Sequence, residues 1–271
     1  MRIDIGAHLG HWPFRKFPWE TPAGLLERMS QGGIDRAFVA NLNAVFYANS
    51  QDGNAELAGW FAADRATRDR LIGQAVLNPS YPGWREDMRQ CRDRYGFRGV
   101  RLYPQYHGYG FDHPDLAELL ALARDSGTPV VFSLRLIDTR GRSWLDVQLD
   151  EGGSEQLLIE KVAGVLTRFS GLRAVVLQTN YVNPTPEIDA TLRNADVLFD
   201  TSRASGCGVV GPNSYNFSAS VEKFGAEKFA FGSMSPFTDS VSPLVRMEMN
   251  DLPETVRNAI WGTNAQRFFR L

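Results

Sequence analysis

The feature that most limits the possible folds of this chain is a repeated alternation between short apolar runs and longer amphipathic stretches. The short runs are rich in β-branched residues and lie near Ile3 and at residues 37–40, 72–77, 99–102, 129–134, 174–177, 197–200 and 229–232. Apolar runs of this length, separated by helical patterns, are typical of buried parallel strands joined by helices. Eight such units favour closure into a (β/α)₈ barrel, a TIM barrel of the α/β class, over an open sheet.

The stretches between these runs carry apolar residues three and four positions apart, as Leu25 and Met29 do in the first of them. The clearest stretch covers residues 157–169 and is followed by Gly171, a plausible helix stop. The chain has 271 residues, close to the roughly 250 of a typical barrel, so we expect one domain over residues 1–271. Its longest loop, residues 137–153, follows the fifth predicted strand and is expected at the barrel mouth.

The charge balance argues against nucleic acid or an anionic membrane as a partner. The formal net charge is -2, and no basic cluster interrupts the sequence. No run approaches the roughly 20 apolar residues that span a bilayer, and the first residues enter a strand pattern directly instead of a signal peptide. We therefore expect a cytoplasmic protein with a small-molecule substrate, compatible with a homo-oligomer. Its two cysteines indicate neither a disulfide framework nor a cysteine metal site.

Four segments, taken in order, resemble those of a known family. They are residues 3–10 (IDIGAHLG), 99–106 (GVRLYPQY), 231–236 (FGSMSP) and 261–267 (WGTNAQR). Together they are similar to the amidohydrolase superfamily, particularly its amidohydrolase-2 branch of metal-dependent hydrolases. The resemblance spans nearly the whole chain and implies a (β/α)₈ barrel whose functional residues lie at the carboxyl ends of the strands.

The resemblance also implies a divalent metal, bound by a His-x-His pair on the first strand, by histidines after the fifth and sixth, and by an aspartate after the eighth. This chain keeps one of those histidines and otherwise has different residues: Gly6 and His8 on the first strand, Ser133 on the fifth, Gln178 or Asn180 on the sixth, and Met234 on the eighth. Since a catalytic zinc needs about three protein ligands, we expect no metal and no other cofactor. A site made of His8, His11 and a carboxylate stays open as an alternative.

Three residues are candidates for catalysis. His8 is the best acid–base group, because an imidazole titrates near neutrality and the first strand should direct it toward the barrel mouth. Tyr103 and His107 follow the fourth strand, where they are placed to orient substrate or transfer a proton. The alternative is that His8 is a relic held by hydrogen bonds and that the other two shape a rigid loop.

The predicted substrate-binding residues are Arg101, Arg135, Asn180, Arg203 and Ser233. The three arginines follow or occupy the fourth, fifth and seventh strands, so they converge at one face and favour an anionic substrate. Arginine donates hydrogen bonds in a fork that suits a carboxylate or a developing oxyanion. For Arg101 the alternative is a salt bridge inside the barrel with Asp4 or Asp200.

The sequence therefore predicts an amidohydrolase-related hydrolase that needs no metal and acts on a small carboxylated ester or lactone. Decarboxylation and hydration also occur among relatives, so the type of reaction stays open. The alternative is a non-catalytic ligand-binding or regulatory protein that has kept the barrel and lost the reaction.

Overall fold

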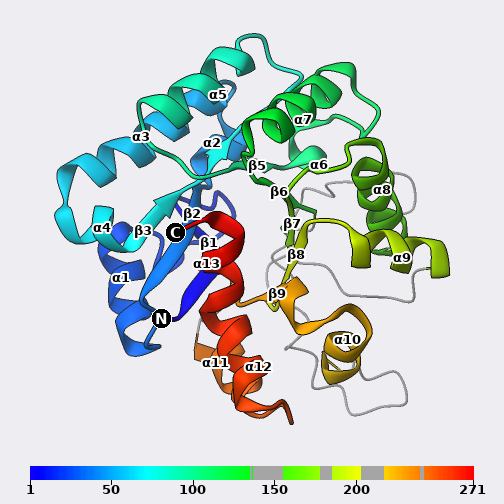
Figure 1. The fold of residues 1–271 in the computed structure, drawn as a ribbon. Coiled ribbons are helices and arrows are strands. Elements are labelled where there is room, and N and C mark those ends of the chain that lie inside the picture. Colours follow the sequence, from blue (N-terminus) through cyan, green and yellow to red (C-terminus); the bar gives the residue numbers. More distant parts are fainter. Residues whose placement is uncertain (135, 137–154, 178–184, 203–216, 239–240) are drawn as a thin grey trace.

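The computed structural model describes residues 1–134, 136, 155–177, 185–202, 217–238 and 241–271. Within these residues the parallel strands form a ring with helices around its outside (Figure 1). The strands are β1 (Ile3–Leu9), β2 (Arg36–Asn41), β3 (Leu71–Gly73), β4 (Ala75–Val76), β5 (Val100–Leu102), β6 (Val130–Ser133), β7 (Ala174–Leu177), β8 (Val197–Asp200) and β9 (Phe229–Ala230).

The ring is a closed barrel of eight strands, because β3 and β4 are two halves of one strand. They flank Gln74, whose N–H donates to Val39 O of β2 at 2.9 Å, while Ala75 N donates to Gly99 O beside β5 at 2.9 Å. Ile5 N of β1 donates to Phe231 O just after β9 at 2.9 Å, which joins the first strand to the last. All eight predicted strands and the predicted barrel class are confirmed.

Most of the helices lie around the outside of the ring. They are α1 (Pro22–Gln31), α2 (Asn43–Phe46), α3 (Ser50–Ala63), α4 (Arg65–Arg70), α5 (Trp84–Asp93), α6 (Pro104–His107), α7 (Pro114–Ser126), α8 (Glu155–Arg168), α9 (Pro186–Asn194), α10 (Phe217–Phe224), α11 (Val241–Glu248), α12 (Glu254–Asn258) and α13 (Asn264–Phe269), with a 3₁₀ turn at Ala226–Lys228 and a π-helical turn at Ala259–Thr263. No helix in the described ranges is long and apolar enough to cross a bilayer.

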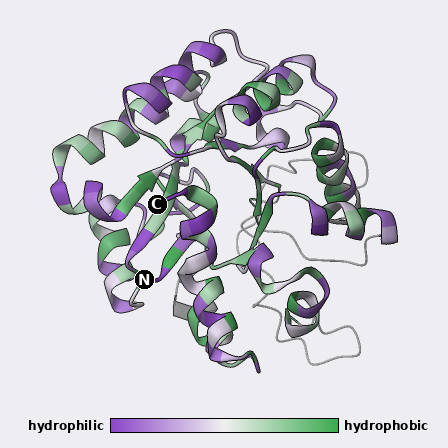
Figure 2. Ribbon diagram, in the orientation of Figure 1, coloured by the Kyte–Doolittle hydropathy of each residue, from purple (hydrophilic) through white to green (hydrophobic). Residues whose placement is uncertain are grey.

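Apolar side chains fill the barrel on both sides of its wall, and the strands are correspondingly the most apolar elements in Figure 2. The inner cluster includes Ile5 and Phe38, and α13 adds Phe268 and Phe269 to it. The rings of Phe38 and Phe269 are 3.9 Å apart, so α13 closes the amino-terminal end of the barrel. The predicted site residues are expected at the opposite end, where the strands finish.

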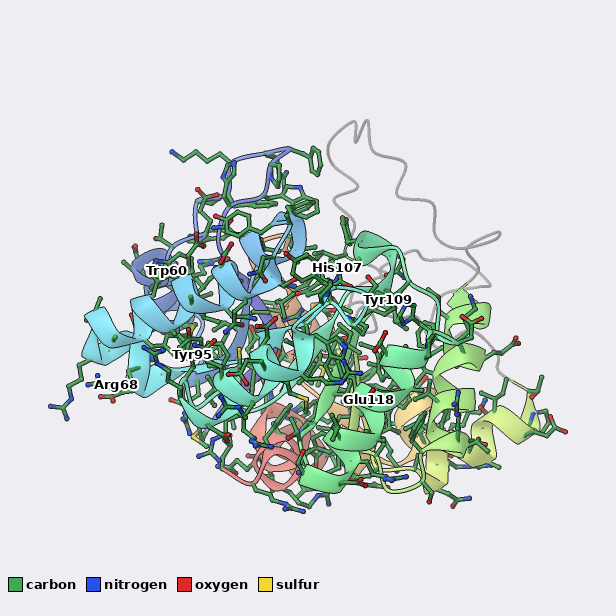
Figure 3. The ribbon with its side chains drawn as sticks, turned by 90° about the horizontal axis from the view of Figure 1, so that it is seen from above. Trp60, Arg68, Tyr95, His107, Tyr109 and Glu118 are labelled. Atoms are coloured by element: carbon green, nitrogen blue, oxygen red, sulfur yellow. The ribbon has the colours of Figure 1, made fainter. Side chains whose placement is uncertain are left out.

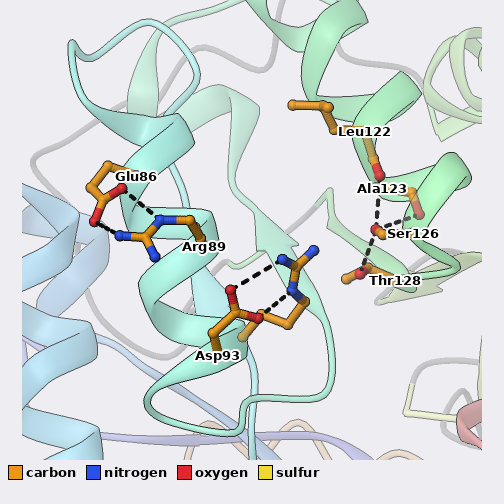
Figure 4. A network of polar contacts seen from close by, with 8 residues as sticks. Glu86, Arg89, Asp93, Leu122, Ala123, Ser126 and Thr128 are labelled. Atoms are coloured by element: carbon orange, nitrogen blue, oxygen red, sulfur yellow. Dashed lines mark hydrogen bonds and ion pairs between the residues drawn. The ribbon is translucent and has the colours of Figure 1, made fainter.

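The outer helices carry exposed ion pairs that contribute little to the stability of the protein. On α5, Arg89 Nε donates to Glu86 at 2.8 Å and Arg92 Nε donates to Asp93 at 2.7 Å (Figure 4). Exposed pairs of this kind stabilise a protein by at most about 1 kcal/mol each. The buried layers, and not the surface charges, therefore hold the end of the barrel in shape.

Candidate functional site at the carboxyl end of the barrel

His8 lies inside the barrel near the end of β1 and is fully buried. The pairing of β1 with β2 shifts register between Asp4 and Ala7, which turns Gly6 and His8 toward the interior while Ala7 packs outside with the helices. The ring nitrogens each make one polar contact: Nε2 lies 2.7 Å from Nη2 of Arg101, and Nδ1 lies 3.1 Å from Ser235 O. Both nitrogens of His8 are therefore engaged.

These two partners determine where the proton of His8 sits. A guanidinium has no acceptor, so Arg101 must donate to Nε2, and Nδ1 must carry the hydrogen that it donates to Ser235 O. Burial, with the positive charge of Arg101, lowers the pKa of His8 well below its usual value. His8 is thus a neutral imidazole of one fixed tautomer.

Arg101, on β5, is also fully buried, with its guanidinium in the barrel interior. Nη1 donates to Ala7 O at 2.9 Å, and the positive charge of Arg101 is compensated by the negative charges of Asp200 and Asp4. Its Nε has no hydrogen-bond partner in the described part of the chain. The guanidinium is therefore a fixed cation with unused donor capacity, on which the charges of Asp4 and Asp200 act; a salt bridge to either carboxylate stays a prediction.

Ser233, predicted to bind substrate, joins β1 to the segment after β9. Its hydroxyl donates to Asp4 Oδ2 at 2.5 Å and accepts from Ser235 N at 2.9 Å, and its N–H donates to Asp4 Oδ1 at 3.0 Å. Burial raises the pKa of Asp4, and these hydrogen bonds oppose that rise. Ser233 thereby positions Ser235, whose carbonyl holds His8.

Tyr103 occupies the centre of the predicted site. Its ring centroid is 6.4 Å from His8 and 6.3 Å from His107, and the guanidinium carbon of Arg101 is 5.6 Å from its ring. Burial raises the pKa of Tyr103 to about 12, against the opposing effects of Arg101 and of a hydrogen bond with Ser133. The phenol is therefore protonated at neutral pH.

His107 ends α6, beside Tyr109, and the two are labelled together in Figure 3. Burial lowers its pKa to about 4, although the backbone around Ala44, Val45 and Leu77 partly opposes this. Neither ring nitrogen has a hydrogen bond of normal geometry to a described residue. His107 is thus a neutral imidazole at neutral pH, with one unprotonated nitrogen.

An aromatic cluster covers this group of residues at the barrel mouth. The ring of Phe237 lies 5.6 Å from His8, 4.7 Å from Trp12 and 5.1 Å from Phe17. Met234, at the position where the resemblance implies an aspartate, is buried in the same cluster. Arg101 and Tyr103, close to this cluster, are both fully buried.

The described residues do not fit a metal ion. The Nε2 lone pair of His8, which a metal would need, already accepts a hydrogen bond from the cationic Arg101. Gly6 and Met234 supply neither a carboxylate nor an imidazole. No group of three or more His, Cys, Asp or Glu side chains with suitable spacing occurs in the ranges that the structure covers. His11, the other histidine of the alternative site, points elsewhere: its side chain is 61% exposed beside Glu20.

The structure brings together His8, Arg101, Tyr103 and Ser233, with His107 at the edge of the group. Arg135, Asn180 and Arg203 lie outside the described residues, as does the loop 137–153, so their predicted roles stay predictions. Sequence reasoning gave no role to Ser235 or Gln74, both fully buried. Gln74 could have been noticed in the sequence, because it is a polar residue within an apolar strand run. No sequence pattern singled out Ser235.

We expect the two buried histidines to make the protein less stable as the pH falls. In the unfolded chain a histidine has a pKa near 6.5. In the folded protein the pKa of His8 lies well below that value, and the pKa of His107 is about 4. Between those values the unfolded state binds more protons than the folded state. The contribution of the two histidines to the free energy of unfolding is therefore fully present above about pH 6.5 and is lost as the pH falls below it. Urea unfolding from pH 7 to pH 4.5 should show a shallower decline in His107→Gln. An identical decline in the two proteins would contradict a buried neutral His107.

Comparisons with known proteins agree with this architecture. A family model described as amidohydrolase matches residues 3–271. No curated protein matches the sequence at a significant level. Among solved structures, an uncharacterized TIM-barrel protein from Bordetella bronchiseptica is 18% identical, with a TM-score of 0.75 over 99% of this chain and 98% of that one.

Two decarboxylases share the fold at similar distance. The 2,6-dihydroxybenzoate decarboxylase from Rhizobium is 14% identical, with a TM-score of 0.72 over 99% of this chain and 98% of that one. A dihydroxybenzoic acid decarboxylase from a Polaromonas species, solved with bound manganese and an inhibitor, is 14% identical, with a TM-score of 0.68 over 100% of this chain and 97% of that one. At such identities the likeness concerns the fold alone.

Proposed function

The chain belongs to the amidohydrolase family, and from this premise we propose that it is a hydrolase that works without a bound metal ion on a small carboxylated ester or lactone. The observation that carries the proposal is the 2.7 Å contact between Arg101 Nη2 and His8 Nε2. This contact supports the proposal because the guanidinium of Arg101 already supplies a positive charge at the barrel centre. Unlike a metal ion, this charge is part of the chain and cannot dissociate. Carboxylate binding by Arg135 and Arg203, a cytoplasmic location and self-association belong to the same proposal.

Under this proposal the chemistry falls to residues around Tyr103. Water attacks the carbonyl carbon and its proton passes to the unprotonated nitrogen of His107, while the unused donors of Arg101 stabilise the oxyanion. Collapse of the tetrahedral intermediate breaks the C–O bond of the ester. The leaving alkoxide takes a proton from the phenol of Tyr103, which regains it from protonated His107. His8 acts as a positioning residue, because its engaged ring holds Arg101.

A second candidate is a ligand-binding protein without catalysis. Two observations favour it: both nitrogens of His8 are engaged, and the aromatic cluster formed by Trp12, Phe17 and Phe237 covers the site. The similar barrels that act on dihydroxybenzoate suggest a carboxylate as the ligand here too. In this case Arg101 would be purely structural.

Turnover after exhaustive chelation distinguishes the candidates. Metal content would be measured by mass spectrometry, and a panel of carboxylated lactones and esters assayed with the chelated protein. We expect at least one substrate to be hydrolysed equally well before and after chelation, with a loss of roughly 10²–10⁴-fold in His107→Ala. His113→Asn is the matched control, since His113 caps α7 by accepting from Asp115 N and asparagine keeps such an acceptor.

The other outcomes are equally informative. Activity that disappears on chelation and returns with added manganese or zinc would overturn the metal-independent proposal. Saturable binding of carboxylates without any product would replace it with the ligand-binding candidate.

A further inference from the structure

A loop of residues 10–20 follows β1 at the carboxyl end of the barrel and leads into α1. Its two ends meet, because Gly10 N donates to Glu20 O at 2.8 Å. A surface loop of roughly 6–16 residues with adjacent ends is an Ω-loop, and Ω-loops are frequently functional. We propose that this segment, the lid loop, opens and closes as one unit over the barrel centre.

The inner face of the lid loop is aromatic and lies near the centre of the site. Trp12 and Phe17 are buried, and their rings lie 4.7 Å and 5.1 Å from that of Phe237. Phe237 in turn lies 5.6 Å from the ring of His8. On the outer face, by contrast, Phe14 is 40% exposed. The loop therefore packs inward on the ring that contacts His8 and presents its other side to solvent.

The tether that joins the lid loop to α2 is a hydrogen bond. His11 N donates to Asn43 Oδ1 at 2.9 Å, and Asn43 Nδ2 donates to Glu56 of α3 at 2.9 Å. A second hydrogen bond, from Phe17 N to Glu20 Oε2 at 3.2 Å, lies within the loop itself. Apolar packing is non-directional, so the ring contacts tolerate displacement once the bond to Asn43 breaks. The loop then moves as a body, because its internal hydrogen bond is kept.

Gly10 provides the hinge at the first end of the lid loop. Its φ is 95°, in the left-handed region that favours glycine, and a β-carbon there would lie 2.3 Å from Asn41 Oδ1. Glycine reaches other backbone conformations at little cost, as a hinge requires. The other end of the loop is fixed by α1, where Thr21 Oγ1 accepts from Gly24 N at 3.2 Å.

The closed position of the lid loop leaves a polar group unsatisfied. Trp12 Nε1 is buried and has no hydrogen-bond partner within the described ranges. A buried donor without an acceptor disfavours the state that contains it, whereas water satisfies the same donor when the loop opens. Apolar packing thus holds the lid closed against this penalty, which keeps the open state accessible.

Native-state hydrogen exchange, followed by NMR at increasing urea concentrations, tests the lid. The reporters of opening are the amide of His11 and the indole N–H of Trp12, and the amide of Ile5 in β1 is the reference. We expect both reporters to be at least about 100-fold less protected than Ile5, with little dependence on urea, as in local opening. The amide of Gly10 at the base should stay protected, because its bond to Glu20 is kept.

Asn43→Ala removes the tether and should speed exchange of the Trp12 indole by roughly two- to tenfold, as expected for the loss of one hydrogen bond. Asn78→Ala is the matched control, since Asn78 Oδ1 accepts from Ser80 N at 3.0 Å in the loop after β4. The control should leave indole exchange unchanged.

Three results would overturn the proposal. The first is indole protection equal to that of Ile5, which would mean that the loop opens only when the whole protein unfolds. The second is an indole exchange rate that Asn43→Ala leaves unchanged. The third is exchange of the Gly10 amide as fast as that of His11, which would mean that the loop unravels and does not move as one unit. The readout is motion in the free protein, so none of these results depends on hydrolysis.

Discussion

Replacing Arg101 by methionine should lower the free energy of unfolding by about 3–5 kcal/mol, the usual loss when one partner of a buried charge group is removed. The change leaves Asp4 and Asp200 without their compensating cation and removes the donors to Ala7 O and His8 Nε2. It should also raise the pKa of His8, because the charge of Arg101 contributes to holding that pKa down. Urea unfolding gives the first quantity and NMR titration of the imidazole gives the second.

Arg98→Met is the control for this experiment. Arg98 lies three residues earlier and is exposed, so the same substitution there should change the stability by no more than about 0.5 kcal/mol. If Arg101→Met were as stable as Arg98→Met, Arg101 would not be the balancing cation of the barrel centre. The proposed reaction would then also lose its fixed cation.

Two glycines of the same helix should respond to alanine with opposite signs. In α3, a β-carbon on Gly53 would lie 2.6 Å from the backbone nitrogen and β-carbon of Ala44 in α2. A β-carbon on Gly59 would meet nothing within 4 Å. Gly59→Ala should therefore stabilise the protein by roughly 0.5–1 kcal/mol through helix propensity, and Gly53→Ala should destabilise it by about 1–3 kcal/mol through overpacking.

The effect at Gly53 should extend to the barrel. Its neighbour Asn54 donates to Val76 O and accepts from Val76 N, both at 2.9 Å, so a displaced α3 would disturb β4. Thermal unfolding of the two variants compares them directly. If both glycines responded with the same sign, the close packing of α2 on α3 would not be the cause.

Much of the fold was predictable because strands and helices differ in local periodicity. The runs near Ile3 and at residues 174–177 were found from apolar composition alone, and both are strands. Their ends were less accurate: β9 covers Phe229–Ala230, whereas the prediction continued to residue 232. Apolar character continues beyond the last ladder hydrogen bond, so composition overestimates a strand.

The site was predictable only in part. The carboxyl ends of parallel strands meet at one end of a barrel, which correctly brought His8, Arg101 and Tyr103 together. The sequence could not show that the Ser233 hydroxyl donates a hydrogen bond to Asp4. Nor could it show that Trp12, Phe17 and Phe237 form a buried cluster near the site. Those contacts depend on side-chain directions in loops, which follow no period.

By itself, the sequence determined the number and order of the strands, since these are properties of residue identity and local spacing. Only the tertiary structure decided which groups surround His8. Arg101 and His8 are 93 residues apart, and His8 and Ser235 are 227 apart, so closure of the barrel alone brings them into hydrogen-bond distance. Distances of that kind are set by strand register around the whole ring, and no local pattern encodes them.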